Sequence, residues 1–278
     1  GQPYYFNFHA TLEGEDSEGE KAIANTMVIG KSGTGKTALI NFLLSQVQKY
    51  DPKPTIFFFD KDRGAEIFVR ACGGAYMALE SGQPTGFNPF QCENTEANVQ
   101  FLCGLMKQLG GKAHYSAAED DDILRAVRAM LDTPMALRSI SNFQKSLPNT
   151  GDDSLYANIR KWTRGNSLGW VFDNPQDKID FSGANIIGFD YTDVIENPQV
   201  RDPVIGYLIH RMEELIDGRR FIYIMDEFWK ILDGEGGLKE FAKNKQKTIR
   251  KQNGMGIFAT QSPEDALKSD ISAALIEQ

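Results

Sequence analysis

The chain has few cysteines and no long apolar run, and both shortages limit what it can be. Its three cysteines, Cys72, Cys92 and Cys103, form no CxxC pair and show no Cys/His metal spacing. A sparse, odd cysteine count is typical of proteins from a reducing compartment. No stretch of about 18 apolar residues occurs, so we expect no membrane span. We also expect no signal peptide.

An excess of positive charge is missing as well. The chain contains 30 Lys and Arg against 38 Asp and Glu, which gives a formal net charge of -8 and a sequence pI of about 5.1. Broad, charge-driven binding to nucleic acid needs a basic surface, so this composition argues against it. A local basic groove stays open.

What is present is the composition of a globular protein. Of the 278 residues, 41% are hydrophobic and 24% are charged, which allows a sizeable core. The sequence starts with Gly1 rather than Met, so we expect it to be a domain excised from a larger protein.

Short apolar runs alternate with helical patterns along most of the chain. Because the runs are continuous rather than alternating, they predict strands of a parallel sheet that is covered on both faces. Strand and helix in alternation indicate an α/β fold. The five expected strands are 26–30, 55–60, 185–190, 221–226 and 256–260, a further strand is expected at 4–10, and helices are expected at 36–50, 204–216 and 238–253.

One interval differs, because it contains no convincing strand. Apolar residues recur there at helical spacing, and Ser116 followed by Glu119 predicts a capping box at a helix start. We therefore expect an all-α insertion at 93–166, between a first part of the core at 1–92 and a second part at 167–278.

A phosphate-binding loop follows the first of the five strands. Gly30–Thr37 matches G-x-x-x-x-G-K-[ST] and opens a helix, which is the context that this motif needs. Its glycines permit unusual backbone angles, so that main-chain amides can surround a phosphate at the positive helix N-terminus. Lys36 can reach the β and γ phosphates, and the Thr37 hydroxyl can bind Mg²⁺. The expected nucleotide-binding residues are Gly30, Lys31, Ser32, Gly33, Thr34, Gly35, Lys36, Thr37 and Ala38.

Hydrolysis needs a second, acidic site, and the strand at 221–226 supplies a candidate. Asp226 at its end would complete the Mg²⁺ site with Thr37, and Glu227 would polarise the attacking water as a general base. The alternative is a strand that ends in a solvated turn. The strand at 256–260 is followed by Gln261, a candidate contact to the γ phosphate or the water, or else a simple turn residue.

A run of cations between the last two strands has two interpretations. It is either a solvated helix face, or it carries an arginine, Arg250, that reaches a γ phosphate bound by a neighbouring subunit.

In this order, these blocks resemble the ATPase domain of type IV secretion and conjugation systems, the fourth VirB component. The resemblance covers nearly the whole chain and rests mainly on the blocks after the P-loop. Those blocks are 59–64, 73–76, 87–89, 189–190, 226–229, 247–254 and 260–265, and the block 3–9 before the P-loop is similar as well.

The resemblance implies a RecA-like core of the FtsK/HerA type with an all-α insertion. It also implies that Lys36 and Thr37 act at phosphate and magnesium, that Asp226 and Glu227 form the hydrolytic site, and that Gln261 is a sensor. Arg250 becomes the arginine contributed in trans, with Lys247 as a second candidate. The implied function is an ATP- and Mg²⁺-dependent motor for pilus assembly and substrate translocation.

The resemblance further implies a location and partners. The motor would lie at the cytoplasmic face of the bacterial inner membrane, beside other secretion subunits, and would form a homo-hexamer. The family's N-terminal domain is absent here and its fold continues past Gln278, so we expect this piece to be trimmed and monomeric.

Two other functions stay open at this stage. One is a DNA translocase of the coupling-protein type, which the negative charge disfavours. The other is a nucleotide switch without hydrolysis, against which Asp226 and Glu227 argue.

Overall fold

The computed structural model describes residues 25–179, 184–227 and 254–261. The strand expected at 4–10, the helix expected at 238–253 and the residues Lys247 and Arg250 lie outside these ranges. The chain divides into two compact units. The first comprises 1–78, 181–195 and 212–278, and the second comprises 79–180 and 196–211.

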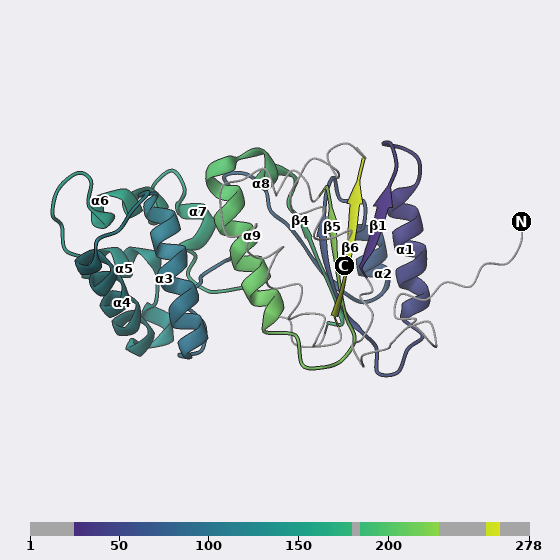
Figure 1. Ribbon diagram of the computed structural model, residues 1–278, viewed down its shortest axis with the longest axis horizontal. Coiled ribbons are helices and arrows are strands. Elements are labelled where there is room, and N and C mark those ends of the chain that lie inside the picture. The colour runs from purple at the N-terminus through teal and green to yellow at the C-terminus, as the bar shows by residue number, and fades with distance from the viewer. Residues whose placement is uncertain (1–24, 180–183, 228–253, 262–278) are drawn as a thin grey trace, which may run out of the picture. The chain divides into compact units, whose positions relative to one another are not determined.

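The first unit is built on one six-stranded sheet in the order β1-β6-β5-β2-β4-β3. Every described strand pair is parallel, and β4, β5, β6 and β1 follow one another in Figure 1. The parallel α/β sheet that the sequence predicts is therefore confirmed. The strands are β1 (Thr26–Ile29), β2 (Thr55–Asp60), β3 (Ala75–Ala78), β4 (Ile186–Asp190), β5 (Phe221–Asp226) and β6 (Gly254–Thr260).

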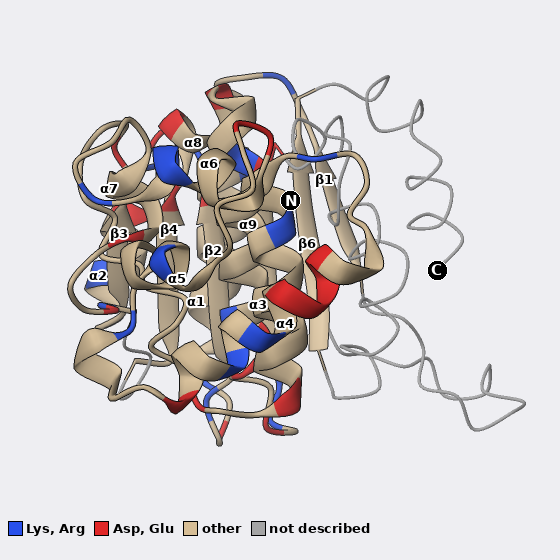
Figure 2. Cartoon of the chain, turned by 90° about the vertical axis from the view of Figure 1, so that its left-hand side faces the viewer, with Lys and Arg blue, Asp and Glu red and all other residues tan. Residues whose placement is uncertain are grey.

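Continuous burial explains why these runs form central strands. All six residues of β2 are buried, including Phe57, Phe58 and Phe59, so both faces of the strand are covered. The strands are free of charged residues except at their carboxyl ends, and β2 and β6 are accordingly tan along their length in Figure 2. The charged residues of the strands, Asp60, Asp190 and Asp226, are thus confined to the carboxyl edge of the sheet.

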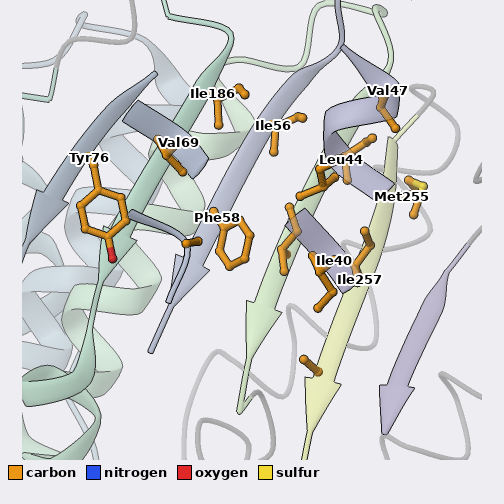
Figure 3. Packing of buried hydrophobic residues seen from close by; sticks show 14 residues of the cluster. Ile40, Leu44, Val47, Ile56, Phe58, Val69, Tyr76, Ile186, Met255 and Ile257 are labelled. Atoms are coloured by element: carbon orange, nitrogen blue, oxygen red, sulfur yellow. The ribbon is translucent and has the colours of Figure 1, made fainter. Parts of the chain in front are cut away.

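Two helices close one face of the sheet in the first unit. They are α1 (Lys36–Val47) and α2 (Glu66–Ala71). Figure 3 shows Ile40, Leu44 and Val47 of α1 packed toward side chains of β2 and β6, such as Phe58 and Ile257. This buried cluster fixes the first turn of α1, and with it the phosphate-binding loop, against the sheet. A short helix, α8 (Thr192–Glu196), follows β4.

The described residues of the second unit form helices and loops, and no strand. It contains α3 (Glu96–Gly110), α4 (Ala117–Asp132), α5 (Ile140–Ser146), α6 (Leu155–Ile159), α7 (Gly169–Phe172) and most of α9 (Pro198–Glu213), with 3₁₀ turns at Met135–Leu137 and Arg160–Trp162. Side chains cap several of these helices, and the capping box predicted at Ser116 and Glu119 is confirmed. Acidic residues gather in the first turns of α4 (Figure 2), where the helix dipole favours them.

Two elements differ from the sequence-based expectation. β3 was not predicted, because its apolar run, Ala-Tyr-Met-Ala, is short and only Tyr76 in it is buried. α9 was predicted from Val204 but begins at Pro198. Its first turns are polar and contain Pro203, so apolar periodicity does not reveal them, whereas proline at the first helical position is favourable.

Candidate active site

The carboxyl ends of four neighbouring strands form a cavity in the first unit. Parallel strands end at the same sheet edge, so the residues that follow β1, β6, β5 and β2 meet there. The cavity has a volume of about 330 Å³. Its walls are Ser32, Gly33, Gly35, Lys36, Thr37, Ala38, Lys61, Asp62, Gly64, Asp226, Glu227 and Gln261.

The loop after β1 has the backbone that a phosphate cradle requires. Gly33 and Gly35 have φ angles of 77° and 90°, in the left-handed region that favours glycine. A Cβ on Gly30 would lie 2.8 Å from Thr34 Oγ1, so this position also needs a glycine. The Gly30 N–H donates to Thr260 O at 3.1 Å, which fixes the loop to β6. The N-terminal amides of α1 therefore face the cavity at a fixed position.

Lys36 and Thr37 project from the first turn of α1 into this cavity. The Lys36 ammonium donates to Gly30 O at 2.6 Å and to Lys31 O at 3.4 Å, so it lies over the loop itself. Thr37 packs closely against the turn after β2, because a Cβ on Gly64 would lie 3.0 Å from Thr37 Cγ2. Gly64 thus permits the close approach of the two loops.

Asp226 lies at the end of β5, where its charge is poorly solvated. The pKa of Asp226 is raised from 3.8 to about 6, chiefly by burial and also by the charges of Glu227 and Asp60, while the charge of Lys36 acts in the opposite direction. The influence of Lys36 shows that this ammonium and this carboxylate belong to one electrostatic centre. A nearby cation stabilises the ionised form of a carboxyl group in such a buried position.

Glu227 follows directly and has a strained backbone. Its φ angle is 53°, which is uncommon for a residue other than glycine, and the residue is buried. Both polar groups of the peptide between Asp226 and Glu227 are held. The Glu227 N–H donates to Ala259 O at 2.9 Å, and the Asp226 carbonyl accepts a hydrogen bond from the Tyr191 hydroxyl. The fold therefore enforces this conformation from two sides.

A buried carboxyl group that sequence reasoning missed lies behind these acids. Asp60, at the end of β2, has no exposed surface. Its Oδ2 accepts from the Tyr76 hydroxyl at 2.5 Å and from the Ala65 N–H at 2.9 Å, while its Oδ1 has no hydrogen-bond partner. Burial raises the pKa of Asp60 to about 6 against the effect of these hydrogen bonds. The sequence did contain a signal for this site, because Asp60 directly follows the apolar residues of β2.

Sequence reasoning also missed the turn that follows Asp60. Lys61, Asp62 and Gly64 line the same cavity as the phosphate-binding loop. The available signal was the dense charge of residues 60–63 directly after a wholly apolar strand.

The cavity brings together most of the residues that the sequence singled out. Lys36, Thr37, Asp226, Glu227 and Gln261 all line it. Gly30, Lys31 and Thr34 belong to the same loop but do not line the walls, and Arg250 lies outside the described residues. Among the described residues, no helix combines the length and the apolar character needed to cross a membrane.

Comparisons with known proteins place the chain in a family. The model of the TraG P-loop domain matches residues 149–278. The type IV secretion system protein VirB4 of Bartonella henselae is 47% identical, over 100% of this chain and 34% of the relative.

Two solved structures share the fold. VirB4 of Thermoanaerobacter pseudethanolicus has a TM-score of 0.69 at 19% identity, over 92% of this chain and 75% of that chain. The plasmid coupling protein TrwB, in complex with the non-hydrolysable GTP analogue GDPNP, has a TM-score of 0.50 at 14% identity, over 91% of this chain and 66% of that chain.

The chain spans about a third of the length of the curated relatives that it matches. The likeness extends over the whole of this chain, and the parallel α/β fold with its phosphate-binding loop is consistent with it. A P-loop fold of this family binds nucleotide. The chain belongs to the VirB4 family of type IV secretion proteins, within which it forms a P-loop nucleotide-binding region.

Proposed function

We propose that this chain is the motor region of a secretion ATPase that hydrolyses ATP with Mg²⁺ to energise type IV secretion or conjugation. One observation carries the proposal. The phosphate-binding loop with Lys36 and the acidic pair Asp226–Glu227 line the same cavity, although about 190 residues separate them in sequence. That is the pairing that hydrolysis requires, beyond binding alone.

Each residue has a chemical role in this proposal. The loop amides and Lys36 bind the β and γ phosphates, and Glu227 accepts a proton from the attacking water. Gln261 orients the water or the γ phosphate from the end of β6. The Thr37 hydroxyl and the Asp226 carboxylate are hard oxygen ligands that line the same cavity, which suits Mg²⁺. When bound, Mg²⁺ would neutralise charge on the phosphates.

A nucleoside triphosphate is the proposed substrate, and two observations support it. The related fold of TrwB was solved with a triphosphate analogue, GDPNP. ATP rather than GTP is proposed because no guanine-reading N-K-x-D motif accompanies the P-loop. Arg250 is proposed to reach the γ phosphate of a neighbouring subunit, which would make a homo-oligomer, a hexamer in the full-length protein, the active form.

The setting of the motor is likewise proposed. Names of the relatives support contacts with other type IV secretion subunits. We place the motor at the cytoplasmic face of the bacterial inner membrane. We also propose that residues 93–166, which lie within the helical unit, are an all-α insertion in the core formed by 1–92 and 167–278.

A DNA translocase of the coupling-protein type is the second candidate, because TrwB shares the fold. Double-stranded or single-stranded DNA added to the full-length protein separates the two. A translocase should release phosphate several times faster with DNA, whereas the secretion motor should not respond.

Phosphate release by the full-length protein tests the main proposal. Wild type should turn over, and Glu227→Gln should lose at least about 10²-fold in rate, since general-base catalysis contributes about 10² to 10⁴. ATP binding should persist in the variant, because glutamine keeps the shape of the side chain. Wild type that binds ATP but never releases phosphate would be a nucleotide switch and would refute the motor.

A further inference from the structure

The cavity contains a second cation, Lys61, whose partner is an exposed aspartate. Of the described residues that line the cavity, only Lys36 and Lys61 carry positive charge, against the carboxylates of Asp62, Asp226 and Glu227. Lys36 comes from the loop after β1, and Lys61 comes from the turn after β2. The two ammonium groups therefore enter the cavity from different walls.

The environments of Lys61 and its partner are unequal. The Lys61 ammonium lies 2.5 Å from Asp62 Oδ2, and their side chains are 17% and 68% exposed. The hydrogen bond from Lys61 to Asp62 is the main cause that raises the pKa of Lys61, and the charges of Glu227 and Asp226 contribute to the same effect. Lys61 is thus held protonated inside the cavity, while Asp62 is largely in water.

The backbone of this turn is held in place by its surroundings. Asp62 and Arg63 have φ angles of 59° and 56°, an uncommon conformation for such residues. The Asp62 N–H donates to Thr192 Oγ1 at 2.8 Å, and the Arg63 side chain donates to Asp190 Oδ2 at 3.1 Å. The end of β4 and the start of α8 therefore hold the backbone of this turn in place. The position of Lys61 at the cavity thus does not depend on its bond to Asp62.

From this geometry we infer that Lys61 is a second phosphate-binding residue, which leaves Asp62 and contacts the γ phosphate when a nucleoside triphosphate binds. The inference rests on the proposed function. An exposed ion pair contributes little stability, so Asp62 can return to water at small cost. A bond from an ammonium to a phosphate inside a sheltered cavity is stronger. Asp62 would compete with the γ phosphate for the Lys61 ammonium.

Equilibrium binding to the full-length protein with Mg²⁺ tests this inference, with a fluorescent non-hydrolysable ATP analogue and fluorescent ADP as probes. Lys61→Met keeps most of the apolar stem but removes the charge. It should weaken binding of the ATP analogue about tenfold or more, and binding of ADP less than about twofold. Lys49→Met is the matched control, because Lys49 lies near the other end of α1 with its ammonium 2.5 Å from Gln46.

A second variant has the opposite expected sign. Asp62→Asn removes the competitor, so it should bind the ATP analogue about two to five times more tightly and leave ADP unchanged. This change is at an exposed side chain, so it tests the inference even if Lys61→Met does not fold.

The outcomes separate the two proposals. Equal weakening of ATP analogue and ADP by Lys61→Met, no change in either, or a loss of affinity in Asp62→Asn would overturn the role of Lys61. Wild type that binds neither probe and releases no phosphate would instead refute the proposed function.

Discussion

At the scale of single residues, the sheet edge contains a carboxyl group whose ionised form is destabilised by burial in the folded protein. Asp60 is fully buried, one of its oxygens lacks a hydrogen-bond partner, and its pKa is raised from 3.8 to about 6. The folded protein therefore binds this proton more tightly than the unfolded chain does. The group favours folding below about pH 4, and this contribution is lost as the pH rises through about 6.

The pH dependence of unfolding should report this residue. A shift of about two pKa units corresponds to roughly 3 kcal/mol, so the free energy of unfolding should rise measurably from pH 8 to pH 5. Asp60→Asn should reduce this rise by the share of Asp60, because an amide does not titrate, and leave the share of Asp226, whose pKa is also about 6. Urea unfolding at several pH values is the measurement. Asp62→Asn, at a 68% exposed carboxylate, is the control and should keep the wild-type slope. An unchanged slope in Asp60→Asn would contradict the argument.

At the scale of elements, the ends of three adjacent strands are joined through one buried tyrosine. Tyr191 directly follows β4, its N–H donates to Asp60 O at 3.1 Å, and its hydroxyl donates to the carbonyl of Asp226. This links β4, β2 and β5 at the edge where the acids lie. The alignment of Asp226 and Glu227 should depend on that link.

Removal of this hydroxyl should affect turnover more than binding. In Tyr191→Phe we expect kcat to fall about tenfold, with nucleotide affinity within about twofold and a stability loss of about 1 kcal/mol. Tyr207→Phe is a matched control, because Tyr207 is also buried and donates to a carboxylate, Asp177, in the helical unit. The control should lose stability but keep kcat. Tyr191→Phe with wild-type kcat would show that the link is dispensable.

Elements also show what the sequence could and could not predict. Continuous apolar runs predicted β2, β4, β5 and β6 well, because both faces of these strands are buried. The apolar run of β3 is only four residues long and mostly not buried, and the start of α9 is polar. From the strand ends, the sequence predicted that the phosphate-binding loop, the acids and Gln261 lie at one edge of the sheet. Residues of all three line one cavity. The chemical roles of these residues stay predictions. Lys61 was missed because charge after a strand is usually solvated.

At the scale of the whole molecule, the chain supplies one half of the catalytic centre that we propose. The cavity contains the phosphate-binding loop and the acids, whereas Arg250 is proposed to act on a neighbouring subunit. The relatives are about three times longer than this chain, so assembly has to be tested on the full-length protein.

Mixed oligomers test that division of labour. Arg250→Ala should lower turnover about 10³-fold with nucleotide affinity nearly unchanged, since the arginine acts on transition-state charge. Mixing it with Glu227→Gln should restore some turnover, because one interface can then pair an intact glutamate with an intact arginine. Phosphate release, with the mass of the complex measured in ATP analogue, is the readout. No recovery in a confirmed mixed oligomer would count against Arg250.

The left-handed backbone at Glu227 also creates a conflict between thermal stability and the catalytic role that we propose for this side chain. Glycine and asparagine adopt this conformation more readily than glutamate does. A laboratory selection for heat resistance alone would therefore favour glycine or asparagine at position 227. On the mechanism proposed here, the selected proteins would be more stable but would no longer hydrolyse ATP.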